Sequence, residues 1–277
     1  MKPEAPIRGP FASKRIRESL SLKANDMPNL LRVNVACSNY DQVVEKCVAW
    51  AEERESHCLT FSAVHMVMEA HDKPDYRATL NSLDMVNPDG MPVVWALRVL
   101  GHKGATRVYG PDATVCLLKA AARQGIPVGF YGGSEATLAR LVEQVKKNYR
   151  GIQIAYAFSP PFRKLTREED AAIVDRINAS GARFLFIGLG CPKQEQWMID
   201  HRDRVPAVLL AVGAAFDFLA GTKPQAPRWM MRSGLEWVFR LGCEPRRLAG
   251  RYFKHNPRFI ALVFRQWVTM RRWADAS

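Results

Sequence analysis

A glycine turn in the second half of the chain has the residue types of a phosphate-binding site. The apolar run 184–187 is typical of a buried strand and leads directly into Gly188-Leu189-Gly190-Cys191-Pro192-Lys193-Gln194-Glu195. Glycines permit a sharp turn and leave amide N–H groups bare, and Pro192 suits the first turn of a helix. A helix N-terminus reached through such a turn favours anions, so we expect a diphosphate to bind here. The substrate-binding residues predicted in this segment are Gly190, Pro192, Lys193, Gln194 and Glu195.

Asp89 is the candidate for acid–base chemistry. It lies in Asn87-Pro88-Asp89-Gly90, directly after an expected strand at 84–87. Pro-Asp-Gly is a strong turn signal, and a turn residue needs no chemical role. A carboxylate at the end of a strand can instead take a proton from an attacking hydroxyl. These residues alone leave both interpretations open.

Polar residues and glycines also follow other expected strands. Thr60, Ser62 and His65 end one strand and begin the next helix, although Ser62 could simply cap that helix. Gly132-Gly133 forms either a second amide cradle or an ordinary tight turn. Asp217 follows the last apolar strand, where it could bind a sugar hydroxyl or cap a helix. We treat all of them as candidate substrate-binding residues.

Alternating strands and helices must position these residues. Such alternation predicts an α/β fold with a Rossmann-like, mainly parallel sheet covered by helices on both faces. Ligands of such sheets bind at the carboxyl ends of the strands. The expected strands are 30–36, 57–62, 84–87, 127–131, 152–157, 183–188 and 207–212. The expected helices are 40–54, 64–71, 74–82, 91–100, 111–124, 134–148, 167–179 and 192–200.

Positive charge is concentrated at the two ends of the chain. The net charge is +13, and residues 228–277 carry eleven Lys/Arg against three Asp/Glu. We predict a flexible basic arm at 1–28, an α/β catalytic domain at 29–227 and a basic, aromatic helical appendage at 228–277. Basic ends favour anionic surfaces. The appendage is either a solvated basic face or a helix on a lipid surface.

Several classes of protein are disfavoured. The six cysteines show no CxxC pair and indicate free thiols in a reducing compartment. There is no signal-peptide pattern and no apolar stretch of about 18 residues, and HExxH, Walker and Asp-x-Asp sequences are missing. A nucleotide-dependent oxidoreductase lacks its GxGxxG sequence. A non-catalytic protein that binds anionic surfaces through its basic ends is the other alternative, and the near-neutral central body argues against it.

Six ordered motifs together resemble the WecG/TagA/CpsF family of bacterial glycosyltransferases, and the resemblance extends from about Leu30 to Tyr252. The motifs are Asn87-Pro88-Asp89-Gly90-Met91-Pro92-Val93-Val94-Trp95, Arg107-Val108-Tyr109-Gly110-Pro111-Asp112, Phe130-Tyr131-Gly132-Gly133, Gly188 to Glu195, Gly213-Ala214-Ala215-Phe216-Asp217-Phe218 and Gly234-Leu235-Glu236-Trp237-Val238-Phe239-Arg240.

The resemblance implies inverting transfer of a sugar, N-acetylmannosamine-type or glucose, from a UDP-sugar to an undecaprenyl-diphosphate-linked saccharide. This reaction would serve cell-surface or exopolysaccharide synthesis without a metal or other cofactor. The implied partners are these two substrates and an anionic membrane surface; nucleic acid is not among them, and a homo-oligomer is left open. The implied place is cytoplasmic, peripheral on the inner face of the cell membrane. One departure concerns donor choice: many members carry Asn where this chain has Ser62-Ala63.

The same resemblance implies roles for individual residues. Asp89 would be the base, and Arg240 and Arg247 would be catalytic. Arg251 would bind substrate, because these three arginines match an appendage that closes over the site and touches the membrane. Asp112 is taken as substrate-binding from its motif.

Overall fold

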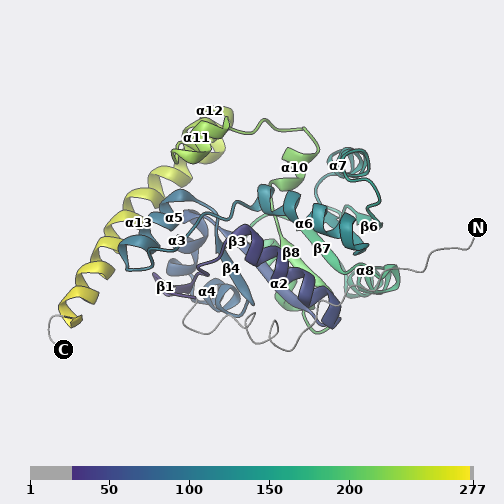
Figure 1. The fold of residues 1–277 in the computed structure, drawn as a ribbon, viewed down its shortest axis with the longest axis horizontal. Coiled ribbons are helices and arrows are strands. Elements are labelled where there is room, and N and C mark those ends of the chain that lie inside the picture. Colours follow the sequence, from purple (N-terminus) through teal and green to yellow (C-terminus); the bar gives the residue numbers. More distant parts are fainter. Residues whose placement is uncertain (1–26, 275–277) are drawn as a thin grey trace, which may run out of the picture.

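A six-stranded sheet, parallel at every pairing, forms the centre of the protein. The computed structural model describes residues 27–274, so the predicted arm lies outside it except for its last two residues. The strand order is β4-β3-β8-β7-β5-β6 (Figure 1). The strands are β3 (His57–Ser62), β4 (Met85–Pro88), β5 (Val128–Gly132), β6 (Ile154–Phe158), β7 (Phe184–Gly188) and β8 (Val208–Ala211). The predicted α/β, Rossmann-like fold is confirmed.

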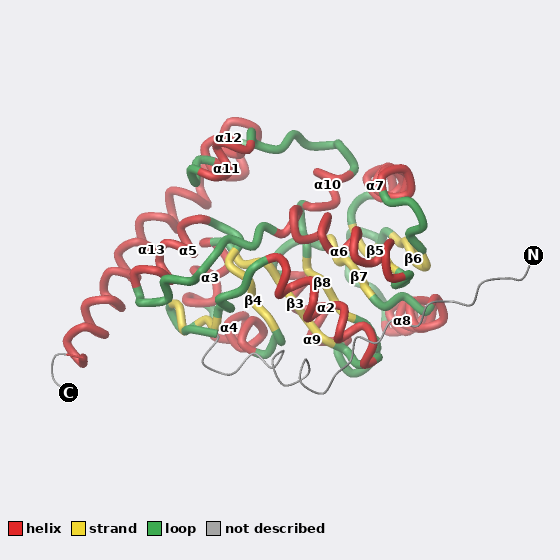
Figure 2. Tube along the Cα trace, in the orientation of Figure 1, coloured by secondary structure: helices red, strands yellow, loops and turns green. Residues whose placement is uncertain are grey.

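Helices cover both faces of this sheet (Figure 2). One face is packed by α3 (Val64–Asp72), α4 (Pro74–Asn81), α5 (Met91–Val99), α8 (Arg167–Ser180) and α9 (Lys193–His201). The other is packed by α2 (Tyr40–Glu53), α6 (Gly110–Gln124), α7 (Glu135–Asn148) and α10 (Ala215–Leu219). All of these helices except the short α10 were predicted from the sequence, with bounds that agree within one residue.

Two apolar layers follow from the alternation of side chains along each strand. In β7, Leu185 and Ile187 belong to the core under α9, whereas Phe184 and Phe186 belong to the core under α6 and α7. All four side chains are fully buried. A continuous apolar run is therefore required, because both faces of the strand are covered.

The predicted strand at 30–36 is wrong. This segment forms a small antiparallel hairpin of β1 (Asn29–Leu30) and β2 (Val33–Asn34), outside the main sheet. Leu31 and Arg32 have φ of 50° and 72°, as a two-residue hairpin turn requires. The apolar residues of the segment are buried mainly by packing against helices, and only the Ala36 N–H reaches β4, at the Val86 carbonyl (2.8 Å).

The C-terminal part contains α11 (Arg228–Arg232), α12 (Glu236–Cys243) and the long α13 (Pro245–Ala274). Helix α13 lies along α3, as Figure 1 shows. Phe259 and Val263 are buried in this contact, and Arg258 binds Asp72 of α3 at 2.7 and 2.9 Å. Gln266 accepts the Leu31 N–H (3.0 Å). None of the described helices combines the length and the apolarity that a membrane span needs.

Candidate active site

The carboxyl ends of the parallel strands bring the predicted site residues to one edge of the sheet. Asp89 follows β4, Ser62 ends β3 and Gly188 ends β7. Strands β3 and β8 lie between β4 and β7. Three strand spacings therefore separate Asp89 from the glycine turn, about 14 Å. A ligand that contacts both must extend along this edge.

Hydrogen bonds of its backbone hold Asp89 in place, so its carboxylate is not needed for this purpose. Its N–H donates to the Ser62 carbonyl (3.0 Å), and its own carbonyl accepts from Nε of Arg107. Nη2 of Arg107 lies 3.5 Å from Asp89 Oδ1. The pKa of Asp89 is raised to about 6 overall: burial and the charge of Glu236 raise it, whereas Arg107 and Arg240 lower it. A carboxylate with this pKa can act as a general base near neutral pH.

Arg107 connects Asp89 to the C-terminal helices. Its Nη2 forms an ion pair with Glu236 of α12, and its Nη1 donates to the Met231 carbonyl of α11 (3.2 Å). Its guanidinium lies 4.3 Å from the centre of the Tyr109 ring. The sequence interpretation assigned no role to Arg107 or Glu236. Each of them lies in one of the six motifs, Arg107 in the second and Glu236 in the sixth. That position is what the sequence offered to single them out.

The arginines implied by the resemblance act on His65, at the start of α3. The pKa of His65 is lowered to about 3 overall, first by burial and then by the positive charges of Arg251, Arg240 and Arg247. His65 is therefore neutral. Arg251 also lowers the pKa of the Cys191 thiol, which burial and Glu195 raise. A field of positive charge thus extends from the start of α3 toward the turn after β7.

The two predicted glycine turns lie side by side, because β5 and β7 are neighbours. The Gly133 N–H donates to the Gly188 carbonyl (3.1 Å), and this bond occupies one of the amides that we expected to face a phosphate. Gly190 has φ of 79°, the left-handed conformation that glycine adopts freely. Lys193 is exposed at the first position of α9, next to this turn.

Replacement of Gly132 by Ala should destabilise the protein strongly. An added Cβ would lie 2.7 Å from the Gly188 backbone, and φ is +119°. We expect a cost of about 1–3 kcal/mol for the backbone conformation and roughly 1–3 kcal/mol for the clash, measured by urea unfolding. Gly181→Ala is the control, because Gly181 has φ of +71° and an added Cβ would meet nothing within 4 Å. Equal losses for the two variants would contradict the predicted clash.

A buried polar cluster joins β3 to the start of α9. Thr60 Oγ1 and Gln194 Nε2 both donate to Oε1 of Glu195, at 2.9 and 2.8 Å. Burial raises the pKa of Glu195. Three buried atoms in and beside this cluster have no hydrogen-bond partner among the described residues: Glu195 Oε2, Gln194 Oε1 and Ser62 Oγ. Buried polar atoms normally have partners, so this cluster suits the substrate-binding role predicted for its residues.

A cavity of about 290 Å³ lies beside Arg107 and brings Asp112 to the same region. One wall comes from the α/β body and the other from α11. Its lining consists of Tyr40, Met91, Arg107, Tyr109, Asp112, Arg228, Met231 and Arg232. Asp217 does not line it. That carboxylate pairs with Lys223 (3.1 Å) and accepts from Thr222 (3.4 Å), so it holds the segment that leads to α11.

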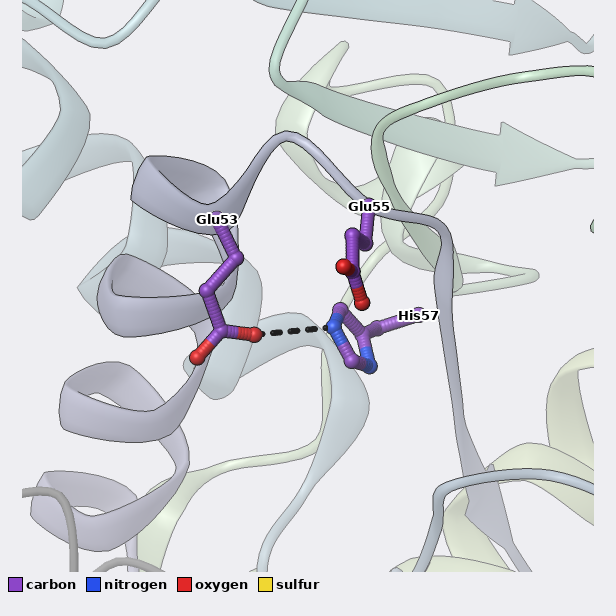
Figure 3. Close-up of side chains that lie close together, drawn as sticks. All are labelled: Glu53, Glu55 and His57. Carbon is purple, nitrogen blue, oxygen red and sulfur yellow. Dashed lines mark hydrogen bonds and ion pairs between the residues drawn. The ribbon is translucent and has the colours of Figure 1, made fainter.

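One group of metal-ligand side chains occurs among the described residues, and it lies away from this edge. Glu53, Glu55 and His57 gather at the amino end of β3 (Figure 3). His57 Nε2 is 3.1 Å from Glu53 Oε2, and its ring stacks on Trp50 with centres 4.5 Å apart. Both glutamates are exposed. The cluster is therefore no part of the site around Asp89.

Comparison with known proteins agrees with the resemblance that the six motifs indicate. The model of the glycosyl transferase WecG/TagA/CpsF family matches residues 28–273. A Bacillus spizizenii protein, N-acetylglucosaminyldiphosphoundecaprenol N-acetyl-beta-D-mannosaminyltransferase, is 34% identical over 198 residues, which cover 71% of this chain and 74% of that protein. These two matches, on a chain with the predicted α/β fold, show that the protein is a glycosyltransferase. The chain belongs to the WecG/TagA/CpsF family, as the six motifs predicted.

Proposed function

We propose that this glycosyltransferase moves N-acetylmannosamine from a UDP-sugar to a polyprenyl-diphosphate-linked N-acetylglucosamine. The name of the Bacillus relative supports this choice of sugar and acceptor over a glucose donor. The observation that carries the chemistry is Asp89, a half-buried carboxylate at the end of β4 whose raised pKa suits a base.

The reaction is a single displacement with inversion. Asp89 accepts the proton of the acceptor hydroxyl while that oxygen forms a bond to the anomeric carbon. The bond from this carbon to the UDP oxygen breaks, and UDP leaves with the bonding electrons. Charge that develops on the leaving diphosphate must be met by donors already in place. The amides of the turn at 188–195 and the cations Arg240, Arg247 and Arg251 serve this purpose.

The cavity beside Arg107 is the place we assign to the acceptor. It shares Arg107 with Asp89, so a saccharide bound there would present its hydroxyl to the base. Asp112 can accept hydrogen bonds from sugar hydroxyls, and Arg228 and Arg232 can bind phosphate oxygens. The wall formed by α11 belongs to the basic C-terminal part, which suits a substrate anchored in an anionic surface.

Arg232→Gln should therefore raise the KM for the lipid-linked acceptor and leave the KM for the UDP-sugar unchanged. A hydrogen bond to a charged group contributes about 1.5–3 kcal/mol, which corresponds to roughly a 10- to 150-fold change. The measurement is initial rate against acceptor concentration in detergent micelles. Arg246→Gln removes an exposed arginine outside the cavity and is the matched control. A selective rise in the donor KM would assign the cavity to the donor instead.

UDP release measured over a panel of UDP-sugars, with polyprenyl-diphosphate N-acetylglucosamine as acceptor, tests the proposed function. We expect acceptor-dependent release with UDP-N-acetylmannosamine and a disaccharide product of inverted anomeric configuration. Preference for UDP-glucose would overturn the proposed donor. Release that does not depend on the acceptor would overturn the proposed transfer.

The outer side of α13 supports a membrane-bound place of action. Phe253, Ile260 and Phe264 share one side of this helix and are 77%, 68% and 62% exposed. Arg265, Arg271 and Arg272 are also exposed. Apolar residues flanked by arginines suit the headgroup region of an anionic bilayer. The lipid-linked acceptor would be found at that surface.

A further inference from the structure

The guanidinium of Arg107 is shared among several oxygen atoms. Nε donates to the Asp89 carbonyl, and Nη1 donates to the Met231 carbonyl at 3.2 Å. Nη2 makes its close contact with Glu236 Oε2, while Asp89 Oδ1 stays at 3.5 Å from the same nitrogen. Arg107 thus binds the backbone of Asp89 firmly and its carboxylate only loosely.

Glu236 is the partner that draws Arg107 away from the Asp89 carboxylate. Its side chain is only 12% exposed, and it also approaches Arg240 with an Nη1–Oε1 distance of 4.0 Å. A fork-shaped guanidinium would otherwise form two parallel hydrogen bonds with the nearest carboxylate, which is the strongest arrangement available to it. With Glu236 in place, that arrangement with Asp89 does not form.

We infer that Glu236 is a positioning residue of the transfer reaction: by occupying Arg107 it keeps the carboxylate of Asp89 free to accept the proton of the acceptor hydroxyl. This inference rests on the proposed role of Asp89 as the base. Glu236 itself need not touch either substrate. Glu236 lies on α12, outside the α/β body. The Asp89 carboxylate is therefore kept free of Arg107 only while the C-terminal helices are docked.

The charges around Asp89 determine whether its pKa rises or falls when Glu236 or Arg107 is replaced. The titratable and charged groups that act on it, or share its surroundings, are Arg107, Tyr109, Glu236, Arg240 and Tyr40. Glu236 raises the pKa of Asp89, and Arg107 lowers it. Loss of Glu236 lets Arg107 pair with Asp89, and both changes lower this pKa. Loss of Arg107 has the opposite sign.

The pH dependence of kcat/KM separates this role from a merely structural one. Asp89 must be ionised to accept a proton, so activity is lost as the pH falls through its pKa. In Glu236→Gln we expect the midpoint of this acid limb to move down by about one pH unit, since a close opposite charge lowers a carboxyl pKa by that order. The rate on the plateau should fall roughly three- to tenfold, because a weaker base transfers the proton less well. Glu236→Asp, which keeps the charge, should restore the midpoint.

Two further variants test the direction of the midpoint shift and whether Glu236 acts on Asp89 through Arg107. Arg107→Gln should move the midpoint upward. In the Arg107→Gln background, replacement of Glu236 by Gln should produce much less shift than in the natural protein, because the two residues act through one contact. Glu244→Gln is the matched control: it removes a carboxylate at the junction of α12 and α13, which pairs with Arg247 and Lys223, and should leave the midpoint in place.

The outcomes distinguish this inference from the proposed function. If Asp89→Asn remains active, the base is another residue and the proposed function fails at that point. If Asp89→Asn is inactive while the Glu236→Gln midpoint stays in place or rises, the positioning role of Glu236 is overturned. A fall in plateau rate without a shift in midpoint would show a structural role only, and circular dichroism would then reveal whether α12 is lost.

Discussion

Asp89→Asn should reduce turnover by about 10²- to 10⁴-fold, the usual loss when a positioned base is removed. Asparagine has nearly the same shape as aspartate but cannot take the proton of an attacking hydroxyl. The measurement is kcat for UDP release with donor and acceptor both saturating. In the natural protein, kcat/KM should fall about tenfold for each pH unit below about pH 6, because the pKa of Asp89 is raised to about 6.

The Asp89→Asn protein should remain folded and should still bind UDP. The contacts that hold residue 89 come largely from its backbone, through the Ser62 carbonyl and Nε of Arg107. The side chain lies loosely beside Arg107, so its neutralisation leaves the turn intact. Asp75→Asn is the control, because Asp75 is exposed on α4. Turnover within tenfold of the natural protein would remove Asp89 from the role of base.

Replacement of Phe253, Ile260 and Phe264 by Ser should nearly abolish binding to anionic vesicles. Full burial of such a side chain contributes about 1.5–3 kcal/mol, so even half-insertion of three corresponds to roughly 50-fold or more in affinity. These residues are exposed on the outer side of α13, and their loss leaves the contact with α3 in place. Co-sedimentation with phosphatidylglycerol vesicles measures the change. Turnover on a water-soluble acceptor should be retained.

The matched control for this membrane prediction is Phe162→Ser. Phe162 is 93% exposed, in the segment between β6 and α8, and its loss should not change vesicle binding. Deletion of residues 228–277 should also abolish binding, but that cut would remove Phe259 and Val263 from the core against α3. Vesicle binding by the triple variant equal to that of the natural protein would show that the outer side of α13 is not the membrane contact.

The membrane interaction should also weaken with salt. Each Lys or Arg near an anionic surface contributes about 1 kcal/mol, and this attraction is screened within a Debye length. Arg265, Arg271 and Arg272 are exposed and available for it, whereas Arg258 is bound to Asp72 and contributes to docking of α13 instead. Arg258, Arg265 and Arg272 are spaced seven residues apart, so the sequence alone does not distinguish them. The ion pair with Asp72 of α3 does.

Local patterns in the sequence were sufficient for the alternation of strands and helices and for the edge at which the site lies. Apolar runs such as 184–187 and 208–211 predict buried strands within a few residues, because burial on both faces requires continuous apolar side chains. The same windows place Asp89 and the glycines directly after strands. The apolar segment 30–36 does not form a strand of the main sheet, because helices rather than neighbouring strands bury its apolar residues.

Tertiary structure alone decided which distant residues come together at this edge of the sheet. Arg107 and Glu236 are 129 positions apart, and Thr60 and Glu195 are 135 apart. No window of the sequence contains both members of either pair. Their contact depends on how α9 packs on the sheet and on how α12 packs against its neighbouring helices. The sequence by itself therefore determined which residues stand at the edge. The packing of the helices decided which charged side chains contact one another, and those contacts help to set the pKa of Asp89.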